Sequence, residues 1–475
     1  MPLRGVEPPH LSAYASETYV YTNFTTAAKN LERVEGIGPS PRDWKSLVLP
    51  LNYTRIVGDT GFEPATSRSQ TVRANQLRQS PVPLAGIEPT RLLRPQDFKS
   101  CVYTNFTTAA LVSILYNQIL LFPMTQPKFF ETLSGEKIPL PVFFPDATRA
   151  VLKTLDSTDI KNTQTPGILV NSFHLLSNPG KDVIKSFGGI KKYMNWNGAV
   201  ISDSGGFQVM SLAKTLGGKN SVTDIGVNFK TDGKKILFTP EISIKTQLAF
   251  KTDMIVVLDD FTDPKSNLTE AKDSVRRTLL WAENCKKIFE ANTKSWPKRP
   301  YLLGVVQGGR FASLRKTCTR ELVNIGFDGL GYGGWPMNLK GSFDHKSADI
   351  IRQNTPDSYF LYGLGIGKPQ DITSLVKSSW HIFDCVLPTR DARHNRLYVR
   401  KNASSLDYSY YIPDKSIHFL DKNPISRFCD CHLCQNYSRS YLAHLFRIKE
   451  MTALRLATIH NLRFYSELMR KLRHV

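Results

Sequence analysis

The sequence predicts an α/β protein whose main domain is a (β/α)8 TIM barrel. Between residues 137 and 390, short apolar runs end in a glycine or a polar residue, and longer helical patterns separate them. Continuous apolar runs are typical of strands buried on both faces, and their alternation with helices indicates a parallel sheet. Seven or eight such units fit a closed barrel, and an open doubly wound sheet is the alternative.

The apolar runs give the candidate strands in order along the chain. They are Gly167–Val170, Gly198–Ser202, Met254–Leu258, Tyr301–Val306, Gly329–Tyr332, Tyr359–Gly363 and Ile382–Val386. Helical patterns are clearest over Leu268–Ala291 and Ala312–Ile325. Two more helices with a basic face that would suit RNA are expected at the C-terminus, over Tyr437–Met451 and Leu454–Leu472.

Polar side chains at the ends of these runs favour the barrel over the open sheet. Asp203, Asp259, Gln307 and Asp384 each lie at the carboxyl end of a different run. In a barrel those ends converge on one mouth, where active sites are built. One such residue alone would be explained as a helix cap, but four together are hard to explain structurally.

Residues 1–123 differ from the rest and are expected to be a non-native or poorly structured extension before a domain of residues 124–475. Val20–Ala28 recurs at Val102–Ala110, and a Gly-apolar-x-Pro phrase returns at irregular spacing. A solenoid would need a fixed period. The segment resembles conceptual translation of non-coding DNA, so our hypothesis is a true start at Met124. A disordered arm that binds RNA is the alternative.

Composition limits the class of protein. The 475 residues carry a formal net charge of +21, most of it after residue 123, which favours a polyanionic partner such as nucleic acid over a merely basic surface. The longest apolar stretch, Ala110–Phe122, is shorter than the ~20 residues that a membrane span requires. Neither a transmembrane span nor a signal peptide is expected, and we expect a cytoplasmic protein.

Cysteine spacing predicts one structural metal site in a subdomain of about residues 420–475. Three of the seven cysteines lie within Cys429–Cys434, which is not the pattern of a disulfide framework. Cys429, Cys431 and Cys434 with a later histidine give three sulfurs and one nitrogen, as in closed tetrahedral zinc sites. His460 is the favoured histidine, although spacing leaves His444 open.

The residues after the second run suit binding of a planar base. Gly205 and Gly206 would let a ligand approach the backbone closely, and Phe207 would stack on its ring. Asp203 would then act as the acid and base. The alternative is a strand-to-helix turn in which Asp203 or Ser204 caps the helix.

Three other strand ends complete the expected site. Asp259 and Asp260 point to opposite sides, so at most one faces the mouth. Gln307 both donates and accepts hydrogen bonds, which suits a purine amide, and Gly334 would allow ligand contact. Asp384 ends an apolar run just before several cations, which suits a nucleophilic acid beside a phosphate backbone; a solvated basic loop is the alternative.

Together these motifs resemble the bacterial-type tRNA-guanine transglycosylases (queuine tRNA-ribosyltransferases). The resemblance covers about residues 124–473, and nothing before Met124 matches. The matching stretches are Ser202–Gln208, Gly304–Gly309, Gly363–Asp371, Phe383–Arg393, Cys429–Cys434 and Thr458–Arg463.

The resemblance implies exchange of the wobble guanine of tRNAs with a GUN anticodon for 7-aminomethyl-7-deazaguanine, in queuosine biosynthesis. Asp384 would be the nucleophile of a covalent ribosyl intermediate and Asp203 the acid and base. The base would be held by Asp203, Ser204, Gly205, Gly206, Phe207, Asp259, Gln307 and Gly334. RNA would be faced by Gly365, Ile366, Gly367, Lys368, Pro369, Gln370, Asp371, Thr389, Arg390, Asp391, Ala392 and Arg393. One structural zinc and a homodimer are implied as well.

Two departures from the family pattern concern the base pocket. Asp260-Phe261 stands where the family has Glu-Cys, and Trp335 and Met337 replace smaller residues. These bulky side chains would narrow the pocket and disfavour full queuine. Two other functions remain open: a related transglycosylase acting on another tRNA or DNA guanine, and a non-catalytic RNA-binding subunit. The presence of both Asp203 and Asp384 disfavours the second.

Overall fold

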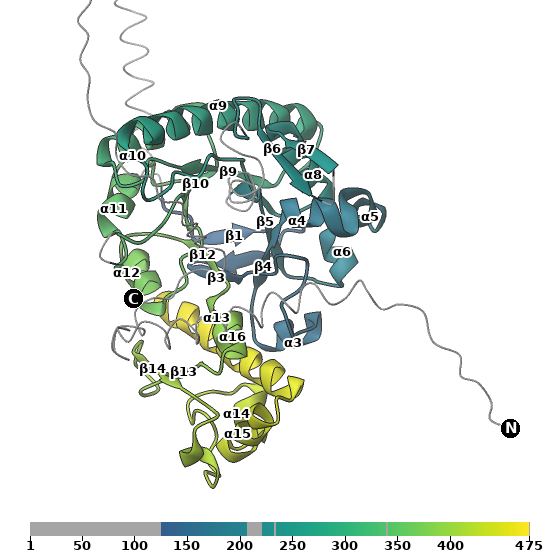
Figure 1. Ribbon diagram of the computed structural model, residues 1–475, viewed down its shortest axis with the longest axis vertical. Helices are drawn as coiled ribbons and strands as arrows, with labels where there is room; N and C mark the ends of the chain where they lie inside the picture. The colour runs from purple at the N-terminus through teal and green to yellow at the C-terminus, as the bar shows by residue number, and fades with distance from the viewer. Residues whose placement is uncertain (1–124, 207–220, 232–233, 339–340, 475) are drawn as a thin grey trace, which may run out of the picture. The chain divides into compact units, whose positions relative to one another are not determined.

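The computed structural model describes residues 125–206, 221–231, 234–338 and 341–474; the expected N-terminal extension lies outside them. Eight parallel strands form the central sheet (Figure 1). They are β3 (Val142–Pro145), β4 (Gly167–Asn171), β5 (Ala199–Asp203), β8 (Met254–Val256), β9 (Tyr301–Val306), β10 (Gly329–Tyr332), β11 (Phe360–Gly363) and β12 (Ile382–Cys385). The seven expected strands are therefore confirmed.

The sheet closes into a barrel, as expected. Each strand pairs with the next one along the chain, and β12 pairs with β3. A parallel bridge between Asp146 and Leu169, with Ala147 N donating to Leu169 O at 2.7 Å, joins β3 to β4. β3 is the strand that the apolar runs did not reveal, because the three residues between Pro141 and Pro145 are too few to stand out.

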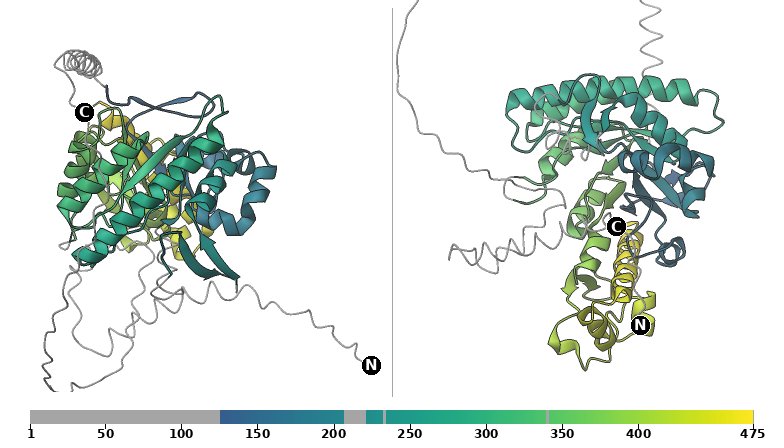
Figure 2. Two further views of the ribbon diagram at one scale, coloured as in Figure 1. Left: turned by 90° about the horizontal axis from the view of Figure 1, so that it is seen from above. Right: turned by 45° about the vertical axis from the view of Figure 1, so that its right-hand side comes forward.

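Helices surround the barrel, as the two views of Figure 2 show. They are α3 (Ser157–Asn162), α4 (Ser172–Leu175), α5 (Lys181–Ser186), α6 (Ile190–Met194), α8 (Pro240–Phe250), α9 (Leu268–Thr293), α10 (Ala312–Ile325), α11 (His345–Gln353), α12 (Pro369–Lys377) and α13 (Leu387–Arg393). A π-helical turn, η2 (Leu176–Gly180), follows α4. The expected α10 is confirmed with its bounds, and α9 starts at Leu268 because Asn267 and Glu270 form a capping box.

Two hairpins are added to the barrel. β6 (Val227–Thr231) pairs with β7 (Lys234–Phe238) between β5 and α8. β1 (Phe129–Glu131) pairs with β2 (Lys137–Pro139), and its fully buried Phe130 packs against Phe144, Tyr301 and Phe360. Since Tyr301 and Phe360 begin their strands, the β1–β2 hairpin closes the amino end of the barrel and leaves the carboxyl end as the mouth.

The C-terminal region packs against the barrel through one long helix. After β13 (Leu397–Arg400), β14 (Tyr408–Tyr411) and the 3-10 turn η4 (Ser416–His418) come α14 (His432–Asn436), α15 (Arg439–Arg447) and α16 (Met451–Leu472). α16 contacts β3, α12 and α13 of the barrel as well as α14 and α15 (Figure 1). None of the helices in the described ranges is both long and apolar enough to cross a membrane.

Candidate active site and metal centre

The barrel mouth brings Asp203 and Asp384 together. Register pairs Asp203 with Asn171 of β4, and Asn171 Nδ2 donates to Asp203 Oδ2 at 3.0 Å. Asp384 in β12 accepts a hydrogen bond from Gly365 N at 2.9 Å. The hydroxyl of Tyr362 lies beside Asp384 and interacts with it electrostatically, although it makes no hydrogen bond of regular geometry with a described residue.

The acids of the mouth hold protons unusually well. Burial raises the pKa of Asp203 to about 6 and that of Asp384 to about 7. The charge of Asp146 raises both values further, and the charge of Asp203 adds to the effect on Asp384. Two acids whose pKa values lie near neutrality can exchange protons with a substrate at physiological pH.

Asp259 and Gln307 form the recognition side of the mouth. Gln307 Nε2 donates to Asp259 Oδ2 at 2.6 Å, and Thr262 N donates to Gln307 Oε1 at 3.0 Å. Burial raises the pKa of Asp259 to about 7, and the charges of Asp203 and Asp260 contribute. Asp260 points the other way and forms an ion pair with Arg277 of α9, so one acid of this pair faces the mouth.

The glycines after β5 leave room for this network. A Cβ atom on Gly206 would lie 2.6 Å from Asp259 Oδ1, and one on Gly205, whose φ is +79°, would lie 2.4 Å from the Cβ of Phe173. A Cβ on Gly334 would lie 3.2 Å from Gln307 Oε1, so this glycine lies against the same amide. Ser204 is buried, and Phe207 lies outside the described residues.

The two stretches expected to face RNA are largely internal. In the loop after β11 and the first turn of α12, Gly365 and Gln370 are exposed, Lys368 and Asp371 are half-buried, and Ile366, Gly367 and Pro369 are buried. In α13 only Arg393 is half-exposed; Thr389, Arg390, Asp391 and Ala392 are buried. Their RNA contacts remain a prediction, and the exposed positions are the ones that a bound strand would reach first.

The structure adds residues that the sequence reading missed. Asp146 follows β3 at the mouth, where the rule that found Asp203 applies but the short strand hid it. The second is Arg315 in α10, which is 1% exposed. Its Nη1 donates to the carbonyls of Val306 and Gly333 at 2.8 and 2.7 Å, and so ties the ends of β9 and β10 together. No sequence signal marks it, because arginine on a helix is usually solvated.

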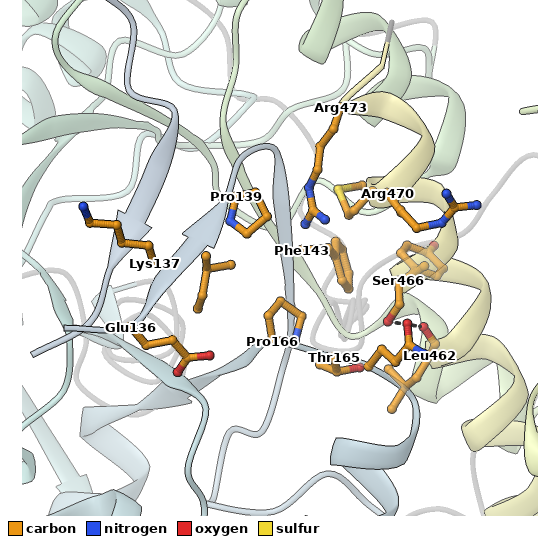
Figure 3. A pocket seen from close by; sticks show the side chains of 14 residues that line it. Glu136, Lys137, Pro139, Phe143, Thr165, Pro166, Leu462, Ser466, Arg470 and Arg473 are labelled. Atoms are coloured by element: carbon orange, nitrogen blue, oxygen red, sulfur yellow. Dashed lines mark hydrogen bonds between the residues drawn. The ribbon is translucent and has the colours of Figure 1, made fainter. Parts of the chain in front are cut away.

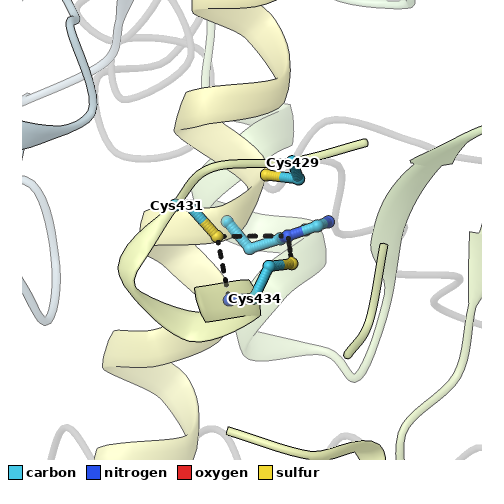
Figure 4. Close-up of side chains that lie close together, drawn as sticks. Cys429, Cys431 and Cys434 are labelled. Carbon is cyan, nitrogen blue, oxygen red and sulfur yellow. Dashed lines mark hydrogen bonds between the residues drawn. The ribbon is translucent and has the colours of Figure 1, made fainter. Parts of the chain in front are cut away.

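The expected group of metal-ligating side chains forms, with His460 as the nitrogen donor. Figure 4 shows its three cysteines, Cys429, Cys431 and Cys434, close together. The donor atoms of Cys429, Cys431, Cys434 and His460 lie within 4.8 Å of one another. His460 Nδ1 is 3.2 Å from Cys434 Sγ, whereas His460 Nε2 lies 2.9 Å from Tyr398 O. Donation of the Nε2 proton to this carbonyl leaves the Nδ1 lone pair for a metal. His444 is exposed on α15, which resolves the choice left open.

α16 connects the metal cluster to the mouth. Arg463 pairs with Asp430 inside the cysteine loop at 2.6 Å. Two residues to either side of Arg463, Asn461 Nδ2 donates to Pro388 O of α13 at 3.0 Å, and Tyr465 OH donates to Gly367 O at 2.6 Å. The same helix therefore holds the metal loop and both stretches expected to face RNA.

A separate pocket lies at the amino end of the barrel (Figure 3). Pro139 and Pro166, which precede β3 and β4, line it with Phe143, and so do Arg470 of α16 and Arg473, which follows the end of that helix. Arg470 is already paired with Glu467 at 3.0 Å. Because the acids lie at the carboxyl ends of the strands, this pocket is distinct from the candidate active site.

Comparison with known proteins identifies the family. The model of the family described as queuine tRNA-ribosyltransferase matches residues 130–475. The queuine tRNA-ribosyltransferase of Blochmanniella pennsylvanica is 38% identical over 335 residues, which are 70% of this chain and 87% of that protein. The one from Buchnera aphidicola subsp. Schizaphis graminum is 37% identical over 72% of this chain and 90% of that protein. The chain therefore belongs to the queuine tRNA-ribosyltransferase family and is a glycosyl-transferring enzyme of that family.

Proposed function

We propose that the protein replaces guanine at the wobble position of tRNAs with a GUN anticodon by 7-aminomethyl-7-deazaguanine. The observation that carries this proposal is the shared mouth. Asp203 and Asp384 lie there with raised pKa values, beside the hydrogen-bonded pair of Asp259 and Gln307. Family membership supports a tRNA substrate, and the net charge of +21 suits a polyanion.

The reaction proceeds by two displacements at the anomeric carbon. The reactive form of the mouth has Asp384 ionised and Asp203 protonated, and it is a minority form at neutral pH because the pKa of Asp384 is the higher of the two. In this form Asp384 attacks C1′ and forms an ester to ribose, while Asp203 gives its proton to the leaving guanine. The incoming base then transfers a proton to Asp203 and attacks C1′, which releases Asp384. Two inversions retain the configuration, as in retaining glycosidases. The wobble nucleotide must leave the anticodon stack to reach the mouth.

The recognition side explains how a deazaguanine would be chosen. Asp259 can accept hydrogen bonds from the guanidine-like edge of the base, and Gln307 can hydrogen-bond with the amide group of the base. The half-buried Trp335 and Met337 follow Gly334, and the half-buried Phe261, two residues after Asp259, packs against the core. We therefore expect poor incorporation of queuine, whose cyclopentene group needs more room; efficient incorporation in a competition assay would contradict this.

We propose zinc as the metal. Three thiolates and one imidazole supply four ligands with no open position, which suits a structural ion. Six free cysteines in the described ranges suit a reducing compartment, so we place the enzyme in the cytoplasm. Exposed apolar side chains near the metal cluster, including Ile417 at 78% and Leu420 at 92%, support a homodimer.

We also retain residues 124–475 as the functional unit. The family match begins at residue 130, near the β1–β2 hairpin that closes the barrel. Mass spectrometry of the protein from its native source should find an N-terminus at Met124. An N-terminus upstream of Met124 would contradict this boundary and would favour the alternative, an N-terminal arm that binds RNA.

The decisive experiment measures base exchange and captures the intermediate. Labelled guanine should enter a GUN anticodon stem-loop, and a covalent RNA adduct should map to Asp384. In Asp384→Asn, exchange should fall by about 10⁴-fold or more, because the nucleophile is lost, while RNA binding persists. Binding without exchange by the unaltered enzyme would favour the non-catalytic subunit, and exchange at another guanine would favour a related transglycosylase.

A further inference from the structure

Asp146 lies between the two proposed catalytic acids on the rim of the barrel. β3 pairs with β12, where Phe144 lies opposite Asp384, and Asp146 itself bridges to β4. β4 pairs with β5, where Asn171 lies opposite Asp203. The order around the mouth is therefore Asp384, Asp146, Asn171 and Asp203, on four successive strands.

The proposed reaction fixes which part of the rim faces the sugar. The proposed base-binding residues lie at the ends of β5, β8, β9 and β10. The anomeric carbon of the ribose must lie next to Asp384 on β12, because Asp384 attacks that carbon. The ribose therefore lies over the remaining part of the rim, formed by β11, β12, β3 and β4. Besides the nucleophile Asp384, Asp146 is the carboxylate at the strand ends of that part.

The side chain of Asp146 is oriented and only partly accessible, and burial raises the pKa of its carboxyl group. Thr148 Oγ1 donates to Asp146 Oδ1 at 2.7 Å. Asp146 is partly exposed, whereas its neighbours Pro145 and Ala147 are buried. A held, solvent-reachable carboxylate beside a nucleophile is suited to accept a hydrogen bond from a substrate hydroxyl.

We propose that Asp146 accepts a hydrogen bond from the 2′-hydroxyl of the target nucleotide and so selects ribose over deoxyribose. The inference rests on the proposed function. Asp384 attacks C1′ from the face opposite the base, and the 2′-hydroxyl of a ribonucleotide projects from that same face. Hydrogen bonds to the hydroxyl next to the anomeric carbon strengthen as the transition state of glycosyl transfer forms.

The electrostatics of the mouth fit this role. The charge of Asp146 raises the pKa of both Asp203 and Asp384. If Asp146 only accepted the hydrogen bond from Thr148, its position would raise the pKa of two catalytic acids without any benefit to the reaction. A bound hydroxyl would donate to Asp146 and reduce that repulsion when substrate is present.

The test compares two anticodon stem-loops that differ only in a 2′-deoxy group on the target guanosine. The unaltered enzyme should show a kcat/KM for guanine exchange that is about 10- to 100-fold higher on the all-ribose loop. In Asp146→Val this ratio should fall to about three or less, because the acceptor is gone. In Asp146→Asn, whose amide oxygen is a neutral acceptor, the ratio should be intermediate.

The matched control is Asp260→Asn, which removes a nearby carboxylate that pairs with Arg277 and faces away from the mouth. Its ribose-to-deoxyribose ratio should equal that of the unaltered enzyme. An unchanged ratio in both Asp146 variants would overturn the inference and leave the proposed function standing. If Asp146→Val does not fold, Asp146→Asn decides alone. An unaltered enzyme inactive on the all-ribose loop would overturn both proposals together.

Discussion

The barrel mouth and the metal region differ in how their charged side chains are arranged. In the mouth, burial raises the pKa values of Asp203, Asp259 and Asp384, and like charges add to this: Asp146 acts on Asp203 and Asp384, and Asp203 acts on Asp259 and Asp384. Around the metal cluster, acids are matched with arginines. The pairs are Arg439–Asp421, Arg455–Asp159 and Arg463–Asp430. The mouth is therefore destabilised by its own charges, whereas the metal region is stabilised by them.

This difference separates the sources of activity and stability. A nucleophile and an acid with pKa values near 7 require a site from which water is excluded and where like charges meet. The free energy that such a site costs must be supplied elsewhere in the fold. α16 is the connection, because it carries His460 and Arg463 of the metal region and also supports the loops beside Asp384 through Asn461 and Tyr465.

Removal of the metal should have the largest effect on stability. A structural zinc site of this kind contributes binding free energy on the order of 10 kcal/mol. Cys434→Ser should therefore lose bound zinc, measured by elemental analysis, and should lower the unfolding temperature of the C-terminal region. His444→Ala is the matched control, since His444 is exposed in the same region and makes no metal contact. Equal zinc content in both variants would contradict the assigned ligands.

The next effect has the opposite sign. The folded-state pKa of Asp384 is raised to about 7 from 3.8, so the folded protein holds a proton that the unfolded chain has already released at neutral pH. Below about pH 4 the carboxyl group is protonated in both states and does not change the free energy of unfolding. As pH rises through 7, the folded-state group loses its proton and the buried charge destabilises the fold. Asp384→Asn should therefore raise the free energy of unfolding at pH 8 by about 2–4 kcal/mol.

The measurement is urea unfolding of both proteins at pH 8 and at pH 5. The gain from Asp384→Asn should be smaller at pH 5, because the folded-state carboxyl group is then mostly protonated. The amide can keep the hydrogen bond from Gly365 N, so the comparison isolates the charge. A variant less stable than the unaltered enzyme at pH 8 would show that the mouth does not destabilise the fold.

The sequence predicted most of the barrel because buried parallel strands leave long apolar signals. Seven strands stood out, and the polar residues Asp203, Asp259, Gln307 and Asp384 marked their ends. β3 was missed because the three residues between Pro141 and Pro145 carry too little periodicity. The N-terminal boundary of the domain therefore came from the unusual repeats of residues 1–123 and not from the strand pattern.

The site was predicted less completely than the fold. Asp146 was not predicted because its strand, β3, was not predicted. Arg315 has the sequence pattern of a surface arginine on a helix, and only the structure shows that it is buried against the carbonyls of Val306 and Gly333. The pairing of basic residues near the metal cluster was also invisible, because the partners of Arg455 and Arg463 include residues almost 300 positions away. Spacing along the chain therefore predicts the ends of strands well but predicts contacts between distant segments of the chain poorly.

The smallest effect tests the metal region by removing one of its charges. Arg455 Nε donates to Asp159 Oδ2 at 2.8 Å and so joins α16 to α3, although the arginine side chain is 44% exposed. Exposed ion pairs contribute little, so Arg455→Met should lower the free energy of unfolding by only about 0.5–1 kcal/mol. Lys245→Met, which breaks the more exposed pair with Glu241 in α8, should change it by less. The sign carries the argument: charge removal here should destabilise, whereas at Asp384 it should stabilise. An Arg455→Met variant more stable than the unaltered enzyme at pH 8 would mean that the two regions do not differ in this way.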